Sequence, residues 1–135
     1  MGRIVQEFAD VPYEELEPGA VYTTTHRLDR ALVAEYDRLV GAAHDGTVPP
    51  WVYCTFFPMY RAMDGRMEQG SVHIRQHGVV HRSVQIGTTL TVQVRVTEKY
   101  EKKERRHVSL EIVFADGDGP VCTSTGTFLW GFAAS

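Results

Sequence analysis

The sequence has no long uninterrupted run of apolar residues, and this limits the kind of protein it can be. Although 43% of the residues are hydrophobic, no apolar segment reaches the roughly 20 residues that a transmembrane helix requires. The opening residues, Met1–Glu7, also lack the apolar core of a secretory signal. We therefore expect no membrane association and a cytoplasmic location.

Basic residues and cysteines are scarce as well. The 14 lysines and arginines are outnumbered by 17 acidic residues, so the formal net charge is -3. Nucleic-acid binding proteins usually present a basic face, and we expect no nucleic-acid partner here. The two cysteines, Cys54 and Cys122, are far apart and each stands in an apolar segment. They are predicted to be small buried thiols in a reducing compartment, not a disulfide.

No group of residues has the spacing of a metal site. His73, His77 and His81 are four residues apart, so on one straight strand they would share a face but lie about 13 Å apart. Zinc needs each nitrogen at about 2 Å, and we expect neither a metal nor another cofactor. The one dense charged run, Glu98–Arg106, mixes both signs and is predicted to be a solvated hairpin tip.

The first half of the chain contains the patterns of two helices. Leu28–Val40 has apolar residues on one face and charged residues on the other, with Asp29 as a candidate N-cap. The second helix begins at Pro49-Pro50 and continues to Met63. Because it is apolar on nearly every side, we predict a buried central helix. Residues 1–19 are expected to form an irregular arm that ends in a turn at Glu17-Pro18-Gly19.

The second half of the chain has the alternating pattern of antiparallel strands. Four long strands are expected after Gly70, and Thr89–Thr97 alternates strictly between valine or leucine and polar residues. Val108–Phe114 repeats the pattern, and Asp116–Gly119 is a strong hairpin turn. A shorter strand is predicted at Val21–His26. The fold class is therefore α+β: a single domain, residues 1–135, with about five strands curved around the central helix and one extra amphipathic helix.

The order of these elements and of several short motifs resembles the N-terminal-type MaoC-like dehydratase domains, which have the hot-dog fold. The matching residues are His73 and Gln76 in the first long strand, His81-Arg82, Gly87-Thr88, Tyr100-Glu101-Lys102, Asp118-Gly119, and Pro49-Pro50 before the central helix. The resemblance covers about four fifths of the chain. It implies an acyl thioester ligand, acyl-CoA or acyl-carrier-protein, and a role in fatty acid metabolism.

The catalytic motif of that family is the main departure. Active members have Gly-Asp-x-Asn-Pro-x-His, but no aspartate or histidine stands at that spacing after Gly41, and the catalytic loop is missing. His44 and Asp45 are the candidate catalytic pair in the shortened loop, because hydration of an enoyl thioester needs an imidazole and a carboxylate. A polar loop without catalytic function is the alternative. Whether the chain is an enzyme, an (R)-specific hydratase or dehydratase, or a degenerate relative stays open.

The candidate substrate-binding residues lie on the central helix and the first long strand. The first free N–H groups of the helix belong to Trp51, Val52 and Tyr53, because the two prolines have none. Further candidates are Phe57, Tyr60, His73 and Gln76. The central helix carries no carboxylate up to Met63, which disfavours a thioesterase of the same fold. A non-catalytic ligand-binding or interaction protein is the other alternative.

A single sheet of five strands leaves strand edges unpaired and the pocket open. A two-fold partner can cover both. We therefore expect a homodimer, or a hetero-oligomer with a second hot-dog chain.

Overall fold

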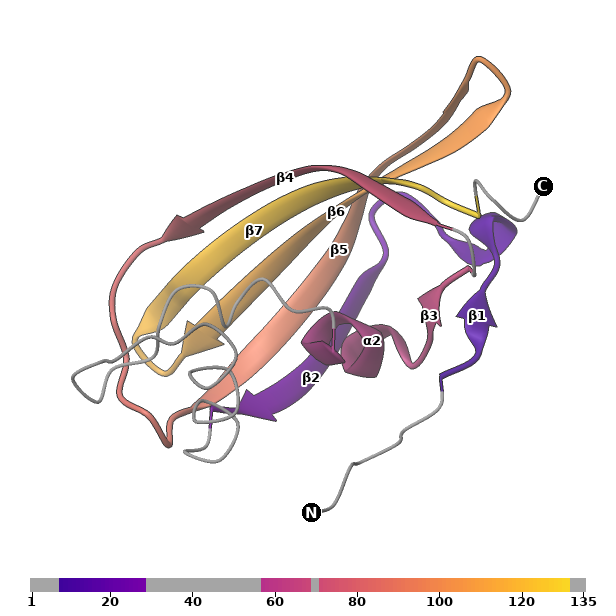
Figure 1. Ribbon diagram of the computed structural model, residues 1–135. Helices are drawn as coiled ribbons and strands as arrows, with labels where there is room; N and C mark the ends of the chain where they lie inside the picture. The colour runs from indigo at the N-terminus through magenta and orange to yellow at the C-terminus, as the bar shows by residue number, and fades with distance from the viewer. Residues whose placement is uncertain (1–7, 29–56, 69–70, 132–135) are drawn as a thin grey trace, which may run out of the picture.

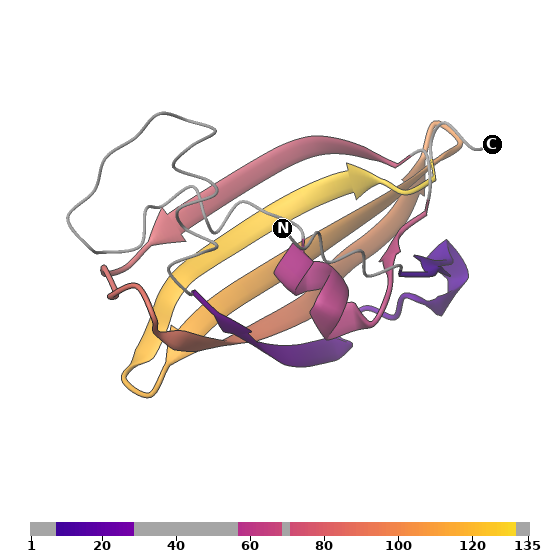
Figure 2. The ribbon, with the colours of Figure 1, turned by 60° about the horizontal axis from the view of Figure 1, so that its bottom comes forward.

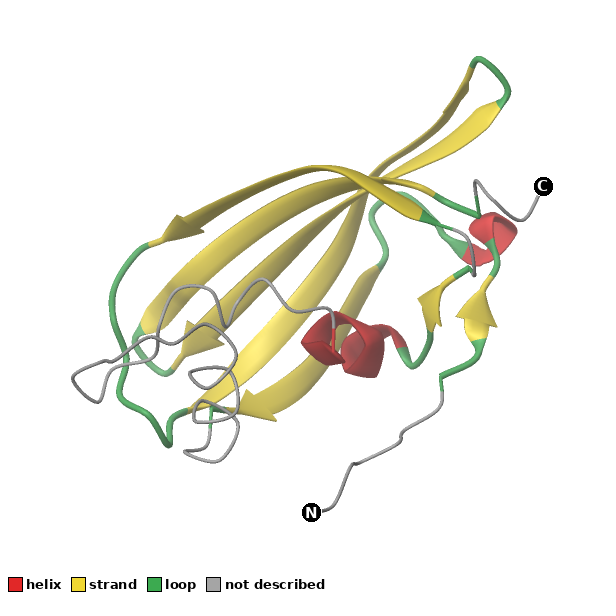
Figure 3. Cartoon of the chain, viewed as in Figure 1, coloured by secondary structure: helices red, strands yellow, loops and turns green. Residues whose placement is uncertain are grey.

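The computed structural model describes residues 8–28, 57–68 and 71–131. The predicted amphipathic helix, apart from Leu28, lies outside these residues, as does the first part of the central helix. The described residues form nine secondary-structure elements, of which seven are strands. Figure 3 shows the strands in yellow.

Five strands form one curved antiparallel sheet (Figure 1). Their spatial order is β2-β5-β6-β7-β4, so β2 and β4 are the two edge strands. This confirms the predicted sheet, including the four long strands after Gly70. The strands are β2 (Val21–Arg27), β4 (Val72–Val80), β5 (Thr89–Lys102), β6 (Arg105–Asp116) and β7 (Gly119–Leu129).

Alternation along the strands places one face of the sheet on the core. Leu90, Val92, Val94 and Val96 of β5 are completely buried, whereas the residues between them are exposed. Their neighbours on β6 are also buried, and Phe114 lies directly opposite Val92. Each such side chain contributes about 1.5–3 kcal/mol through burial. We call this the inner face of the sheet, and the opposite one the outer face.

The helix α2 (Phe57–Met63) lies on the inner face (Figure 2). It packs mainly against β2 and β5, and its Met59 and Met63 are buried in the core. The helix ends at Met63, because Asp64 adopts a left-handed conformation with φ of 51°. The prediction of a central helix is confirmed for this described part. In the strand order, β7 and β4 are at the end of the sheet opposite to β2 and β5, and so lie farther from α2 (Figure 2).

The prediction of an irregular N-terminal arm is wrong for the part that the structure describes. Asp10–Val11 forms strand β1, which pairs in parallel with β3 (Arg66–Met67), and Tyr13–Glu15 forms the 3₁₀ helix η1. An ion pair between Asp10 and Arg66 joins the two short strands. The expected turn is present between η1 and β2, where the Ala20 N–H donates to the Glu17 carbonyl at 2.9 Å.

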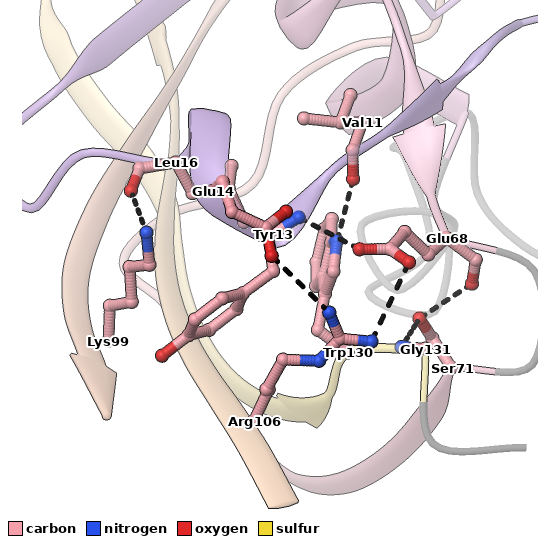
Figure 4. A network of polar contacts seen from close by, with 10 residues as sticks. All are labelled: Val11, Tyr13, Glu14, Leu16, Glu68, Ser71, Lys99, Arg106, Trp130 and Gly131. Atoms are coloured by element: carbon pink, nitrogen blue, oxygen red, sulfur yellow. Dashed lines mark hydrogen bonds and ion pairs between the residues drawn. The ribbon is translucent and has the colours of Figure 1, made fainter. Parts of the chain in front are cut away.

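Polar contacts fasten this N-terminal segment to the sheet (Figure 4). Trp130 Nε1 donates to the Val11 carbonyl at 2.7 Å, and the Tyr13 N–H donates to Glu68 Oε1 at 2.8 Å. A backbone carbonyl and a backbone amide of the segment are thereby satisfied by the side chains of the residues directly after β7 and β3. We call this set of contacts, together with those of Leu16 and Arg106 below, the N-terminal clamp.

The β5–β6 hairpin projects beyond the body of the sheet (Figure 1), as expected for the charged run. Its turn residues Lys103 and Glu104 have φ of 54° and 64°, typical of a tight two-residue hairpin. The interpretation as a solvated tip is wrong for two members of the run. Lys99 Nζ donates to the Leu16 carbonyl at 2.8 Å, and Arg106 lies 3.7 Å from a Glu68 oxygen. These two cations belong to the clamp.

A second polar anchor joins the chain after β4 to the β6–β7 turn. Arg82 Nη1 donates to Asp116 Oδ2 at 2.8 Å, and Arg82 also bonds the other carboxylate oxygen. The same guanidinium donates to the Gly119 carbonyl at 2.7 Å. The bidentate geometry fixes the turn at the start of β7.

Candidate functional site

The edge strand β4 contains a bulge, and this bulge determines which of its side chains face the core. His73 pairs with Phe128, but the next pair is Arg75 with Thr127, so Ile74 is an extra residue in β4. A bulge of this kind shifts the alternation of faces by one residue. From Arg75 onward the side chains of β4 therefore lie on faces opposite to those of an unbulged strand.

The bulge brings His73 and Gln76 onto the same face. Residues paired across antiparallel strands share a face of the sheet. His73 is opposite the buried Phe128, and Gln76 is opposite Gly126, so both lie on the inner face. On an unbulged strand, two residues three positions apart would point to opposite sides.

The same register separates the three histidines. His77 pairs with the exposed Thr125, which places His77 on the outer face. His81 follows the end of β4, and its Nε2 lies 2.9 Å from Thr123 Oγ1 on that same face. The prediction that His73 shares a face with His77 and His81 is therefore wrong. Within the described residues, no cluster of three or more His, Cys, Asp or Glu could hold a metal ion.

An aromatic stack holds the His73 ring. Its centroid lies 4.7 Å from that of Phe128, with an angle of 21° between the planes. Trp130 meets Phe128 edge to face at 6.4 Å. Such contacts fix ring orientation as well as burying area. His73 is thus an oriented side chain at the border between the core and the open surface of β4.

A hydrogen bond holds the Gln76 amide. Gln76 Nε2 donates to Ser124 Oγ at 3.1 Å. Ser124 is 3% exposed, whereas Gln76 lies on the exposed edge strand. The pair therefore connects the interior of the sheet with its surface.

Two glycines lie beside this pair, one covered by an aromatic ring and one open. Gly126 lies opposite Gln76, and a Cβ there would come within 3.3 Å of the Phe128 ring. Gly78 lies opposite Ser124, and a Cβ there would have no neighbour within 4 Å. On the inner face the Phe128 ring therefore packs over Gly126, and the space beside Gln76 is open at Gly78.

Tyr60 of α2 lies toward the N-terminal segment. Its ring meets Phe8 edge to face at 5.9 Å, and it is partly buried against the core. Burial raises the pKa of its hydroxyl, and the nearby Arg66 partly opposes this effect. Contact between Tyr60 and a ligand stays a prediction.

The other predicted site residues lie at the edge of the described structure or beyond it. His44, Asp45, Trp51, Val52 and Tyr53 fall outside the described residues. Phe57 is the first residue of α2. Their catalytic and substrate-binding roles stay predictions.

Sequence reasoning missed Ser124. The signal was available in the strand alternation, because Cys122, Ser124 and Gly126 fall on the same face as Phe128. A row of small residues that ends in a large aromatic one is unusual for an inner face whose β5 and β6 positions are valine, leucine, isoleucine and phenylalanine. The bulge at Ile74 left no comparable signal in the sequence.

Comparisons with known proteins agree with this architecture. No protein-family model and no curated protein matches the sequence, but solved structures do. The MaoC-like dehydratase from Rhodospirillum rubrum matches with a TM-score of 0.69 and 16% identity, over 87% of this chain and 94% of that one. The chain has the hot-dog fold of the MaoC-like dehydratases.

Two further structures with this hot-dog fold extend the comparison. The (R)-hydratase from A. caviae, involved in PHA biosynthesis, matches with a TM-score of 0.63 and 18% identity, over 87% of this chain and 98% of that one. The HadBC (3R-hydroxyacyl-ACP dehydratase) complex from Mycobacterium tuberculosis matches with a TM-score of 0.63 and 16% identity, over 82% of this chain and 95% of that one. At these identities the likeness concerns the fold. In the described part of this hot-dog chain, no helix has the length and apolarity to cross a membrane.

Proposed function

We propose that the protein binds an acyl thioester, carried by CoA or by an acyl-carrier protein, and is of the enoyl hydratase/3-hydroxyacyl dehydratase type. The observation that carries the proposal is the bulge at Ile74, which places His73 and Gln76 together on the inner face. Both residues match the motif of the MaoC-like domains. The named functions of the R. rubrum, A. caviae and M. tuberculosis structures support the same ligand class.

The described site suits binding better than turnover. Hydration of an enoyl thioester needs a base, an acid and donors for the developing enolate oxygen. The paired positions of β4 and β7 give the inner face one imidazole, His73, and no carboxylate. A carboxylate would have to come from Asp45, beside His44, or from a partner chain. We therefore expect the isolated protein to bind thioesters with weak or absent hydratase activity.

A second hot-dog chain is part of the proposal. Four of the five exposed large hydrophobic residues in the described chain lie on the edge strand β4: Val72, Ile74, Val79 and Val80. An apolar edge strand that is left uncovered promotes aggregation. A second copy or a related chain paired with β4 would cover these residues and enclose the inner face beside His73. The HadBC structure, a complex by its name, supports such an assembly. The cytoplasmic location of the protein stays a separate prediction.

The test is a binding panel with a matched control on the same strand. Crotonyl-CoA and butyryl-CoA are titrated into the wild type, His73→Ala and His77→Ala, with circular dichroism to show that each variant is folded. Because His73 lies on the inner face and His77 on the outer face, His73→Ala should weaken binding at least about tenfold while His77→Ala leaves it unchanged. Absence of saturable binding to the wild type, or equal effects of both variants, would overturn the proposal.

Turnover is measured in the same samples. Hydration of crotonyl-CoA that is lost in His44→Ala and in Asp45→Asn would assign the reaction to the shortened loop. Release of free CoA from butyryl-CoA would instead indicate a thioesterase. Full hydratase activity in both loop variants would contradict the predicted catalytic pair.

A further inference from the structure

A serine hydroxyl is buried in the middle of the apolar inner face. Among the described residues, Ser124 and His26 are the only buried polar ones. Ser124 lies between Ile112 of β6 and Gly78 of β4. A buried hydroxyl is unfavourable unless it forms a hydrogen bond, so a serine here needs a compensating partner or a use.

The partner is Gln76, and its geometry is unusual. Gln76 is directly opposite Gly126, which has no side chain, and reaches diagonally to the hydroxyl of Ser124. Within the part of the chain that the structure describes, neither the Gln76 nor the Ser124 side chain forms a second hydrogen bond. The Ser124 proton and the Gln76 carbonyl oxygen are therefore available for further bonds.

A half-turn rotation of the Gln76 amide exchanges donor and acceptor in its bond to Ser124, but the bond itself remains possible. If Ser124 donates to the amide oxygen, the Gln76 N–H groups face the open surface of β4 instead. In either orientation the buried serine fixes the amide, and a polar atom of Gln76 remains accessible. An amide offers both a donor and an acceptor, which matches a ligand hydroxyl because a hydroxyl both donates and accepts.

We propose that Ser124 is a positioning residue, which fixes the Gln76 amide so that it binds a hydroxyl group of the ligand. The inference rests on the proposed function, since it deepens the same site. The open space at Gly78 gives a ligand access to the amide, and the His73–Phe128 stack forms an apolar wall beside it. An acyl thioester can present a hydroxyl from two sources: the acyl chain, as in a 3-hydroxyacyl group, or the carrier, through its pantetheine arm or the ribose of CoA.

The test compares ligands that differ by one hydroxyl. Dissociation constants for (R)-3-hydroxybutyryl-CoA and butyryl-CoA are measured with the wild type, Ser124→Ala, Ser124→Thr and Thr125→Ala. If the amide reads the acyl hydroxyl, Ser124→Ala reduces the preference for the hydroxylated ligand about 2- to 10-fold, the value of one neutral hydrogen bond. Ser124→Thr keeps a hydroxyl and should retain the preference. Thr125→Ala, on the exposed outer face, should change nothing.

The second set of ligands separates the two sources of the hydroxyl. The N-acetylcysteamine thioesters of both acyl groups lack the hydroxyl of the pantetheine arm. If Ser124→Ala weakens both CoA thioesters but neither N-acetylcysteamine thioester, the amide binds a hydroxyl of the carrier. If it reduces the 3-hydroxybutyryl preference in both carriers, the amide binds the acyl chain.

Two results would overturn the inference. Equal weakening of all four ligands would show a purely structural role for Ser124, and no effect on any of them would show no role. Both require that the wild type binds thioesters. If the wild type binds none, the proposed function itself fails, which is a different and separately visible result.

Discussion

The N-terminal clamp can be tested by replacing Trp130 with phenylalanine. Trp130 is 1% exposed, and its Nε1 donates to the Val11 carbonyl at 2.7 Å (Figure 4). Its indole ring also packs edge to face with Phe128. Phenylalanine keeps an aromatic ring in the core but has no donor. The Val11 carbonyl then loses its side-chain partner.

Two terms determine the expected loss of stability. Leaving an acceptor without its partner costs about 1–3 kcal/mol, and the half-buried position of Val11 favours the lower part of that range. The smaller ring adds a packing loss like that of other modest large-to-small changes, about 0.5–1.5 kcal/mol. We expect the free energy of unfolding to fall by about 1.5–3.5 kcal/mol, which a domain of ordinary stability survives.

The assay combines urea unfolding with amide hydrogen exchange. Unfolding gives the total loss, and exchange of the Tyr13 amide, which donates to Glu68, reports local opening of the clamp. Thr91→Val, on the exposed face of β5, is the control and should change stability by less than about 0.5 kcal/mol. A loss below about 1 kcal/mol in Trp130→Phe, with unchanged protection of the Tyr13 amide, would refute the role of the indole in holding this segment.

Two other predictions follow from the edge strand and from the Arg82 anchor. Light scattering should show a dimer that Val79→Lys dissociates, because lysine disfavours edge pairing, while Val21→Lys on β2 leaves it intact; a monomeric wild type would remove this prediction. Hydrogen bonds from Arg82 and from the Asp118 N–H lower the pKa of Asp116 from 3.8 to about 2. Its stabilising effect is therefore complete above the unfolded-state value and lost as the pH falls toward 2. Asp116→Asn should lower the urea midpoint more at pH 7 than at pH 3, and equal shifts at both pH values would contradict this.

The sheet was predictable because its physics is local. Leu90 to Val96 alternates with polar residues, and a strand with one face on the core needs that pattern. The hairpin at Asp116–Gly119 was equally visible, since glycine and aspartate suit the required backbone conformations. The apolarity of Pro49–Met63 alone predicts a core helix, and its described part, Phe57–Met63, is one. In each case the residues that decide the structure are neighbours in the sequence.

The clamp was not predictable, because its partners are far apart in the sequence. Lys99 bonds the carbonyl of Leu16, 83 residues away, and Trp130 bonds that of Val11, 119 residues away. Read locally, Lys99 is one cation in a mixed run, and such runs are usually solvated. Nothing within the run distinguishes the two cations that reach the clamp from those at the exposed tip. Long-range contacts of this kind follow from the fold and not from a local pattern.

The composition of the candidate site depends on one residue that pattern reasoning cannot assign. The period of a strand is two, so an extra residue exchanges the faces of everything beyond it. If Ile74 were paired like the other residues of β4, the alternation from Val80 back through Arg75 would place His73 on the outer face, with His77. The bulge instead puts His73 beside Gln76 and opposite Phe128, on the side of the core. The matches to the MaoC-like motif therefore acquire a common site only through the bulge, and the choice of which histidine can meet a ligand is made by backbone register.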